Sequence, residues 1–303
     1  MSTCESSSGL VSPARLPFGV AVLGGPTTVL DVLGRRIVCD PTFDPPTDHS
    51  YLQKTSGPAV GLDAVGAVDV VLVSHDLHPD NLDVSGRSYA LSSGSVLAPV
   101  SAARRLGGPA VGLDAWSTWT SPDGVLSVTA VPARHGPADG EVDEDGFVNC
   151  EVSGFVVTAA GGPTVYVSGD NASLEIVLEI RERLGSPGVA VLFAGAASVP
   201  TKFRGRPLTL TADRAAAAAE ILGSPHVVVA HQEGWAHFRD DASATYRAFD
   251  EVGIAGRLCQ MPLGTWCSAW VEAWHQERLA RCDVARYSRN RPRRSFAASL
   301  DTT

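Results

Sequence analysis

The chain has 303 residues, of which 44% are hydrophobic and 19% are charged, and its formal net charge is −9. This composition excludes an intrinsically disordered protein, and no apolar run reaches the roughly 18 residues of a membrane span. Residues 1–19 lack the pattern of a secretory signal. We therefore expect a cytoplasmic protein whose six cysteines, none of them in a C-x-x-C pair, are reduced thiols.

The charges divide the chain unevenly. Residues 281–303 contain six Arg and two Asp, so the preceding 280 residues carry a net charge of −13. A body with this acidic excess is a poor surface for nucleic acid. We predict one domain at 19–280, an N-terminal extension at 1–18 and an Arg-rich, flexible tail at 281–303.

Short β-branched runs that stop at Gly, Pro, Asn or Asp predict buried strands with polar residues at their ends. We expect these strands at 19–23, 27–32, 35–39, 68–74, 96–98, 126–131, 152–158, 164–168, 189–193, 227–230 and 256–259. Helices are expected at 101–106, 173–185, 211–222 and 242–252. Strands dominate the first half and alternate with helices in the second, which predicts an α/β protein with helices outside two β-rich halves.

Polar residues are densest after the strand expected at 68–74, in the segment SHDLHPDNLD. A strand fixes the backbone and a following loop can turn several side chains to one side, so imidazoles and carboxylates there can converge on one divalent ion. The alternative is a turn-forming segment that caps the next helix. The ligand candidates in it are His75, Asp76, His78, Asp80 and Asn81.

Three later strand ends repeat this arrangement. VPARHGP presents His135, YVSGDN presents Asp170, and VVAHQEGWAHF presents His231 followed six residues later by His237. A single histidine at a strand end is more often a hydrogen-bonded core residue than a ligand. Four such ends in one chain, however, favour a metal site at a shared sheet edge.

These motifs, together with GGPTTVLDVLGRRIVCDPTFDPP near the start, occur in the order found in metallo-β-lactamase fold metal-dependent hydrolases. The chain most resembles the branch that includes L-ascorbate-6-phosphate lactonase and many bacterial hydrolases. The resemblance covers about residues 20–262. It implies a four-layer αββα sandwich of mixed β-sheets with outer helices, and a site for one or two metal ions at the edge that the sheets share.

The family motif H-x-H-x-D-H is interrupted here by one inserted residue. Alignment from the strand gives the first ligand position to His75, whereas alignment from Leu82 and Asp83 gives it to Asp76. Asn81 stands where the family has its last histidine, and because an amide is a weaker ligand than imidazole, the second metal position should bind weakly or not at all. The resemblance implies the further ligands His78, Asp80, His135, Asp170 (bridging) and His231.

The implied activity is hydrolysis of a small ester, lactone or phosphoester by water activated on a divalent metal, with zinc as the first choice and Mn or Fe as alternatives. Asp80 or His237 would shuttle the proton. Asp40 would orient a ligand histidine or stabilise a turn. The basic residues expected to bind an anionic substrate are Arg134, Lys202 and Arg204.

Two other functions stay open: an iron or redox enzyme on the same fold, and a catalytically silent protein whose broken motif binds a metabolite or a partner. The retained His135, Asp170 and His231 favour an enzyme. We expect a small-molecule substrate as the partner, no nucleic acid and no membrane, and we leave a homo-oligomer open.

Overall fold

The computed structural model describes residues 9–142 and 149–268, so the predicted tail at 281–303 lies outside the described residues. Two six-stranded sheets dominate this part of the chain. The first sheet has the order β1 (Phe18–Gly24), β2 (Thr27–Val32), β3 (Arg35–Cys39), β6 (Val70–Leu72), β7 (Val96–Pro99) and β8 (Ala110–Leu113). The second has the order β14 (His226–Ala230), β13 (Val189–Phe193), β12 (Val165–Val167), β11 (Ser153–Ala159), β10 (Leu126–Pro132) and β9 (Thr118–Thr120).

Both sheets are mixed. In the first, β1, β2 and β3 pair antiparallel and the remaining strands pair parallel. In the second, β12, β13 and β14 pair parallel and the others antiparallel. A short hairpin of β4 (Thr47–Asp48) and β5 (Gln53–Lys54) stands apart from both sheets. The parallel strands bring several carboxyl ends to one edge, where the polar motifs follow.

Four of the helices in the described residues begin at a side chain that caps the first turn. Asp83, Ser173, Thr211 and Asp241 each accept a hydrogen bond from a backbone N–H of the first turn. The helices are α1 (Leu62–Val65), α2 (Val84–Leu91), α3 (Val100–Leu106), α4 (Leu174–Leu184), α5 (Ala212–Leu222) and α6 (Ala242–Glu251), with 3₁₀ turns η1 (Phe203–Gly205) and η2 (Ala255–Arg257). No helix of the described residues is long and apolar enough to cross a membrane.

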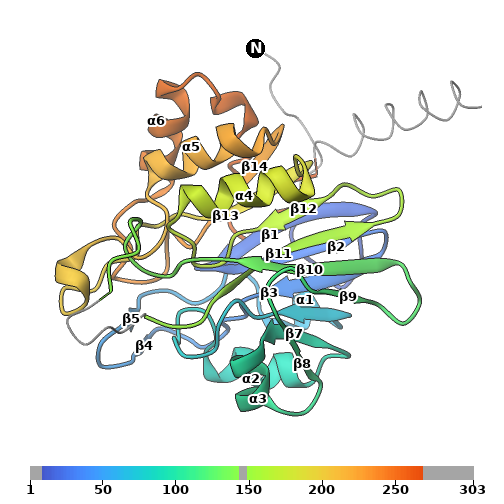
Figure 1. Cartoon of the computed structure of the whole chain (residues 1–303). Helices are drawn as coiled ribbons and strands as arrows, with labels where there is room; N and C mark the ends of the chain where they lie inside the picture. The colour runs from blue at the N-terminus through green and yellow to red at the C-terminus, as the bar shows by residue number, and fades with distance from the viewer. Residues whose placement is uncertain (1–8, 143–148, 269–303) are drawn as a thin grey trace, which may run out of the picture. The chain divides into compact units, whose positions relative to one another are not determined.

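Helices cover the outer face of each sheet. The helices α4, α5 and α6 lie beside β12, β13 and β14, whereas α2 and α3 lie beside β7 and β8 (Figure 1). One apolar core joins Val177, Ile180 and Phe249 to Leu192 and Val229 of the second sheet. A second joins Ala90, Ala102 and Leu106 of α2 and α3 to the first sheet. The predicted αββα arrangement of mixed sheets with outer helices is confirmed.

Ten of the eleven predicted strands are present, within a few residues at their ends. The strand predicted at 256–259 is wrong, because the 3₁₀ turn η2 occupies its start and only Leu258 forms a single bridge, to Val227. The short or exposed strands β4, β5, β8 and β9 were not predicted, since their sequences lack a long β-branched run. Helices α1 and α2 were also missed.

The prediction that all cysteines are reduced is wrong for one pair. Cys259 and Cys267 form a disulfide, with Cα atoms 6.6 Å apart. The turn at 262–264 folds the chain back between them, and their spacing of eight residues carries no recognisable signal for this. Cys39 and Cys150 are free and buried, while Cys4 and Cys282 lie outside the described residues.

Residues 9–17 belong to the expected N-terminal extension. The buried side chain of Arg36 in β3 links this segment to the first sheet. Arg36 is fully buried and donates two hydrogen bonds of 2.8 Å to the Asp31 carboxylate. Its remaining N–H groups donate to the carbonyls of Ser12, Ala14 and Val65. The ion pair therefore fastens the segment before β1 to the sheet.

Replacing Arg36 by Leu should lower the free energy of unfolding by about 3–5 kcal/mol, because the Asp31 carboxylate is left buried without its counter-charge. Urea denaturation followed by circular dichroism measures this loss. Arg247→Ala on the exposed face of α6 is the control, with an expected change within about 0.5 kcal/mol. A loss below about 1 kcal/mol for Arg36→Leu would show that the ion pair does not hold the segment.

Candidate metal centre

The polar residues of the four motifs meet where the strand ends of the two sheets approach each other. Gly169, before Asp170, has φ +54°, and a Cβ there would lie 2.7 Å from the Ser153 oxygen and 2.9 Å from the Ser74 Cβ. A Cβ at Gly195 would lie 1.9 Å from the His231 oxygen. Only glycine permits these approaches, which bring segments distant in sequence to one place.

His75, His78 and His135 form the first group, hereafter the three-histidine cluster. The Nε2 atoms of His75 and His135 lie 2.9 and 3.1 Å from Nδ1 of His78. All three rings are buried or nearly so. His75 and His78 both point inward, whereas Leu77 between them turns outward and is 51% exposed.

Neighbouring groups set which nitrogens of these rings carry a proton. The Leu208 carbonyl, 3.0 Å from His135 Nδ1, can only accept, so His135 donates there and its Nε2 carries a lone pair. Ser74 Oγ donates to Asp40 at 2.6 Å and therefore accepts from His75 Nδ1 at 3.0 Å, which leaves a lone pair on His75 Nε2 as well. Both lone pairs face His78 Nδ1, which can donate to only one of them, and this is the arrangement that a cation would satisfy.

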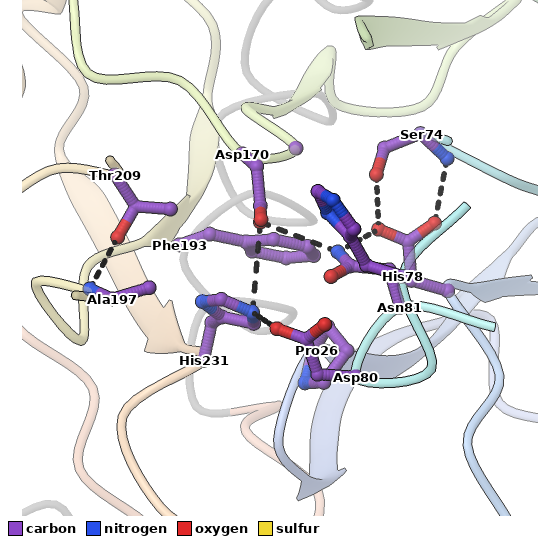
Figure 2. Close-up of polar contacts among 12 residues, drawn as sticks. Pro26, Ser74, His78, Asp80, Asn81, Asp170, Phe193, Ala197, Thr209 and His231 are labelled. Atoms are coloured by element: carbon purple, nitrogen blue, oxygen red, sulfur yellow. Dashed lines mark hydrogen bonds and ion pairs between the residues drawn. The ribbon is translucent and has the colours of Figure 1, made fainter. Parts of the chain in front are cut away.

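Asp80, Asp170 and His231 form the second group, hereafter the carboxylate cluster. His231 Nε2 lies 3.3 Å from Asp80 Oδ2 and 3.6 Å from Asp170 Oδ1, and the three side chains point toward one another (Figure 2). Asp170 also reaches the three-histidine cluster, since its Oδ2 lies 3.4 Å from His135 Nε2. Buried Oδ1 of Asp80 and Oδ2 of Asp170 accept no hydrogen bond. Such oxygens are costly to bury without a cation.

The electrostatics of the two clusters favour neutral imidazoles. Burial lowers the pKa of His78 to about 4 and that of His135 to about 3, so both rings are neutral at pH 7, the form in which imidazole can bind a metal. Burial raises the pKa of Asp170, and the charges of Asp80 and Asp40 add to this. Burial acts the same way on Asp80, but hydrogen bonds from His231 and His237 hold the pKa of Asp80 well below its ordinary value.

Asp40 and Asn81 support the ligand candidates from behind. Asn81 Nδ2 donates to Asp40 Oδ2 at 3.1 Å and to Asp170 Oδ1 at 3.2 Å (Figure 2). Burial raises the pKa of Asp40 to about 7, against the hydrogen bonds from Ser74 and Asn81. Asp40 and His231 both have positive φ, at +42° and +63°, a strained backbone that is found mainly at functional sites. Asn81 thus orients Asp170, and Asp40 orients His75 through Ser74.

A pocket opens beside the clusters. His78, Asp80, His135 and His237 line a cavity of about 20 Å³, which is room for about one water molecule or ion. It shares Tyr51, Leu52, Val199 and His237 with an open pocket of about 320 Å³. A larger cavity of about 510 Å³ next to the Cys259–Cys267 disulfide contains no member of either cluster. The open pocket of about 320 Å³ therefore borders the small cavity at the candidate metal centre.

Not every predicted site residue reaches this place. The buried carboxylate of Asp76 faces away from the clusters and pairs with Arg105, at 2.6 Å, and with Arg87. Arg134 points to Ser173 and the Ala138 carbonyl, and exposed Arg204 pairs with Glu141. Of the three basic candidates, only Lys202 lines the small cavity.

Sequence reasoning missed three residues that lie at the site. Tyr51 and Asn149 line the small cavity, and Asn149 accepts a hydrogen bond of 2.7 Å from Lys202. The Cys150 sulfur lies among the nitrogens of the three-histidine cluster. Burial raises the pKa of this thiol. No motif marks these residues, because their positions depend on long-range packing.

The structure separates the two alignments of the first motif. His75→Ala should weaken zinc binding by 10-fold or more, because it removes one of the three imidazoles that form the cluster. Asp76→Asn should leave the zinc affinity within about threefold and lower the free energy of unfolding by about 1–2 kcal/mol, since Arg87 and Arg105 lose their counter-charge. Competition with a chromogenic chelator measures both affinities. The reverse order of affinities would assign the ligand to Asp76.

Several known proteins share this fold. The uncharacterized protein Rv0906 of Mycobacterium tuberculosis is 32% identical over 128 residues, and the match covers 39% of this chain and 34% of that protein. The chain thus matches about a third of the length of this curated relative. A possible metal-dependent hydrolase from Veillonella parvula superposes with a TM-score of 0.71 at 14% identity, covering 82% of this chain and 98% of that one.

Two further structures come from enzymes of different activity. Isothiocyanate hydrolase from Delia radicum gut bacteria has a TM-score of 0.67 and 19% identity, over 79% of this chain and 94% of that one. CmlA, a diiron β-hydroxylase from Streptomyces venezuelae, has a TM-score of 0.60 and 16% identity, over 83% of this chain and 54% of that one. Identities this low show a common fold and nothing more.

The family is established by the sequence itself. The model of the beta-lactamase superfamily domain matches residues 35–232, which is more than half of the chain. This range contains all six members of the two clusters, from His75 to His231. The resemblance to the L-ascorbate-6-phosphate lactonase branch stays a prediction. The chain belongs to the beta-lactamase superfamily domain family and has the metallo-β-lactamase fold.

Proposed function

We propose that this protein is a metal-dependent hydrolase that cleaves a small ester, lactone or phosphoester. The observation that carries the proposal is the pair of adjacent buried clusters, whose lone pairs and unpartnered carboxylate oxygens face one another beside an open pocket. His75, His78 and His135 would hold one divalent ion. Asp80 and His231 would hold the other, with Asp170 between them.

A bound divalent ion would supply Lewis acidity and a water pKa of about 7. His237 would accept the proton that the attacking water releases. Its Nε2 lies 3.0 Å from Asp80 Oδ2. Asp80 can only accept, so Nε2 carries the proton, and the buried Nδ1 of His237, which has no hydrogen-bond partner, is free to take one. His237 also lines both the small cavity and the open pocket, so its imidazole lies beside a substrate bound there and would serve it as general base and then as general acid.

The pocket indicates the class of substrate. Its volume of about 320 Å³ is at the lower end of the range for small-molecule sites. Lys202 lines the small cavity that shares residues with this pocket, and its charge helps to lower the pKa of His78 after the larger effect of burial. A small substrate that carries a carboxylate or phosphate group would pair with Lys202.

One alternative is an iron-dependent oxidation at the same centre, since CmlA, a diiron β-hydroxylase, has the same fold. Histidine and carboxylate ligands suit iron as well as zinc. Identifying the metal and testing for oxygen consumption separates this alternative from hydrolysis.

The metal-loaded chain should hydrolyse members of a panel of nitrophenyl esters, lactones and phosphodiesters, and chelation should abolish this activity. His237→Gln should lower kcat by about 10²–10⁴-fold at unchanged metal content, because the substrate loses its proton acceptor. His226→Gln, at the far end of β14, is the matched control. If metal-loaded protein shows no hydrolysis above the rate of free metal, or activity only with iron and oxygen, the hydrolase proposal fails.

Lys202→Met should raise KM for anionic substrates by about 10-fold or more, with kcat and the KM of neutral esters nearly unchanged, because it removes a charge-assisted contact. Steady-state kinetics with a matched anionic and neutral ester pair measure the difference. Arg204→Met, whose arginine pairs with Glu141, is the control. Equal effects of Lys202→Met on both esters would contradict recognition of the anion.

A further inference from the structure

Cys150 lies beside the three-histidine cluster but is not among the metal ligands that the family resemblance implies. Its Sγ and the ligand nitrogens of His75, His78 and His135 all lie within 4.8 Å of one another. The residue is buried, forms no disulfide, and lies three positions before β11. The other free cysteine of the described residues, Cys39, is buried within β3 and belongs to neither cluster.

The four atoms have nearly the spacing of a tetrahedral site. Bond lengths of about 2.0–2.1 Å to nitrogen and about 2.3 Å to sulfur place tetrahedral ligand atoms about 3.3–3.6 Å apart. The two nitrogen separations of 2.9 and 3.1 Å are already close to this. The sulfur lies within 4.8 Å of every nitrogen, which leaves little more than 1 Å between the observed upper bound and this tetrahedral spacing.

We propose that Cys150 is a thiolate ligand that completes a His₃Cys metal site with the three-histidine cluster. This inference rests on the proposed function, because it requires that the cluster binds a metal. On binding, the S–H bond gives way to a metal–sulfur bond and the proton passes to solvent. The site thereby becomes distinct from the carboxylate cluster, where every ligand candidate offers oxygen or nitrogen.

The two metal positions then differ in selectivity. A thiolate is a soft ligand that favours zinc and cobalt(II) over manganese(II). The carboxylate cluster has two carboxylates and one imidazole, with Asn81 in the position of a further histidine, and is the harder and weaker site. One ion should therefore be held tightly by nitrogen and sulfur, and a second more weakly by oxygen and nitrogen.

Cobalt(II) reports directly on sulfur ligation. The metal-free chain loaded with one equivalent of cobalt(II) should show a near-ultraviolet sulfur-to-cobalt charge-transfer band. Cys150→Ser should abolish the band and weaken zinc binding by about 10-fold or more, whereas Cys39→Ser should retain both. Cobalt bound to the unaltered chain without this band, or a band that survives in Cys150→Ser, would overturn the proposal.

X-ray absorption at the zinc edge of the unaltered chain provides a test that does not depend on the folding of a variant. One sulfur scatterer at about 2.3 Å is expected among nitrogen ligands. Bound zinc with only nitrogen and oxygen neighbours would overturn the thiolate ligand while leaving the metal site intact. Failure of the chain to bind either zinc or cobalt would instead contradict the proposed function, and with it the thiolate site.

Discussion

The candidate metal centre is defined by buried polar atoms that have no hydrogen-bond partner in the described residues. Asp80 and Asp170 each bury a carboxylate oxygen that accepts no hydrogen bond, and the imidazoles of His75, His78 and His135 converge on one another. Burying a polar group without a partner costs roughly 1–3 kcal/mol, and a charge costs more. The fold accepts this cost at one sheet edge, where glycines at 169 and 195 allow the strand ends to approach. A divalent cation would offset it.

The groups behind the ligand candidates act as much on orientation as on stability. The Leu208 carbonyl fixes the tautomer of His135, and the Ser74–Asp40 pair fixes that of His75. Asn81 directs Asp170 while leaving its own oxygen unpartnered. In the proposed ligand set, Asn81 in place of a histidine and Cys150 as a thiolate would shift the ligand strength toward the three-histidine cluster. The centre would thus be asymmetric, with one tightly held ion and one more weakly held ion.

The sequence was sufficient to predict elements that depend on local patterns. The β-branched runs gave the strands that lead into His75, His135, Asp170 and His231, and the family resemblance gave the order of the layers. Contacts made by long-range packing could not be predicted. The outward turn of Leu77, the pairing of Asp76 with Arg105, the Cys259–Cys267 disulfide and the position of Cys150 all depend on residues far apart or on loop conformation.

The most direct test of the account is elemental analysis of the 303-residue chain purified without a histidine tag or chelator. Counting Zn, Mn, Fe and Ni per chain, before and after reconstitution, asks whether the buried clusters bind a metal at all. The account predicts one tightly held divalent ion, with a second taken up only at higher metal concentration. Metal at trace levels only, even after reconstitution of the folded chain, would contradict it and would leave the two clusters as a buried polar network without a cation.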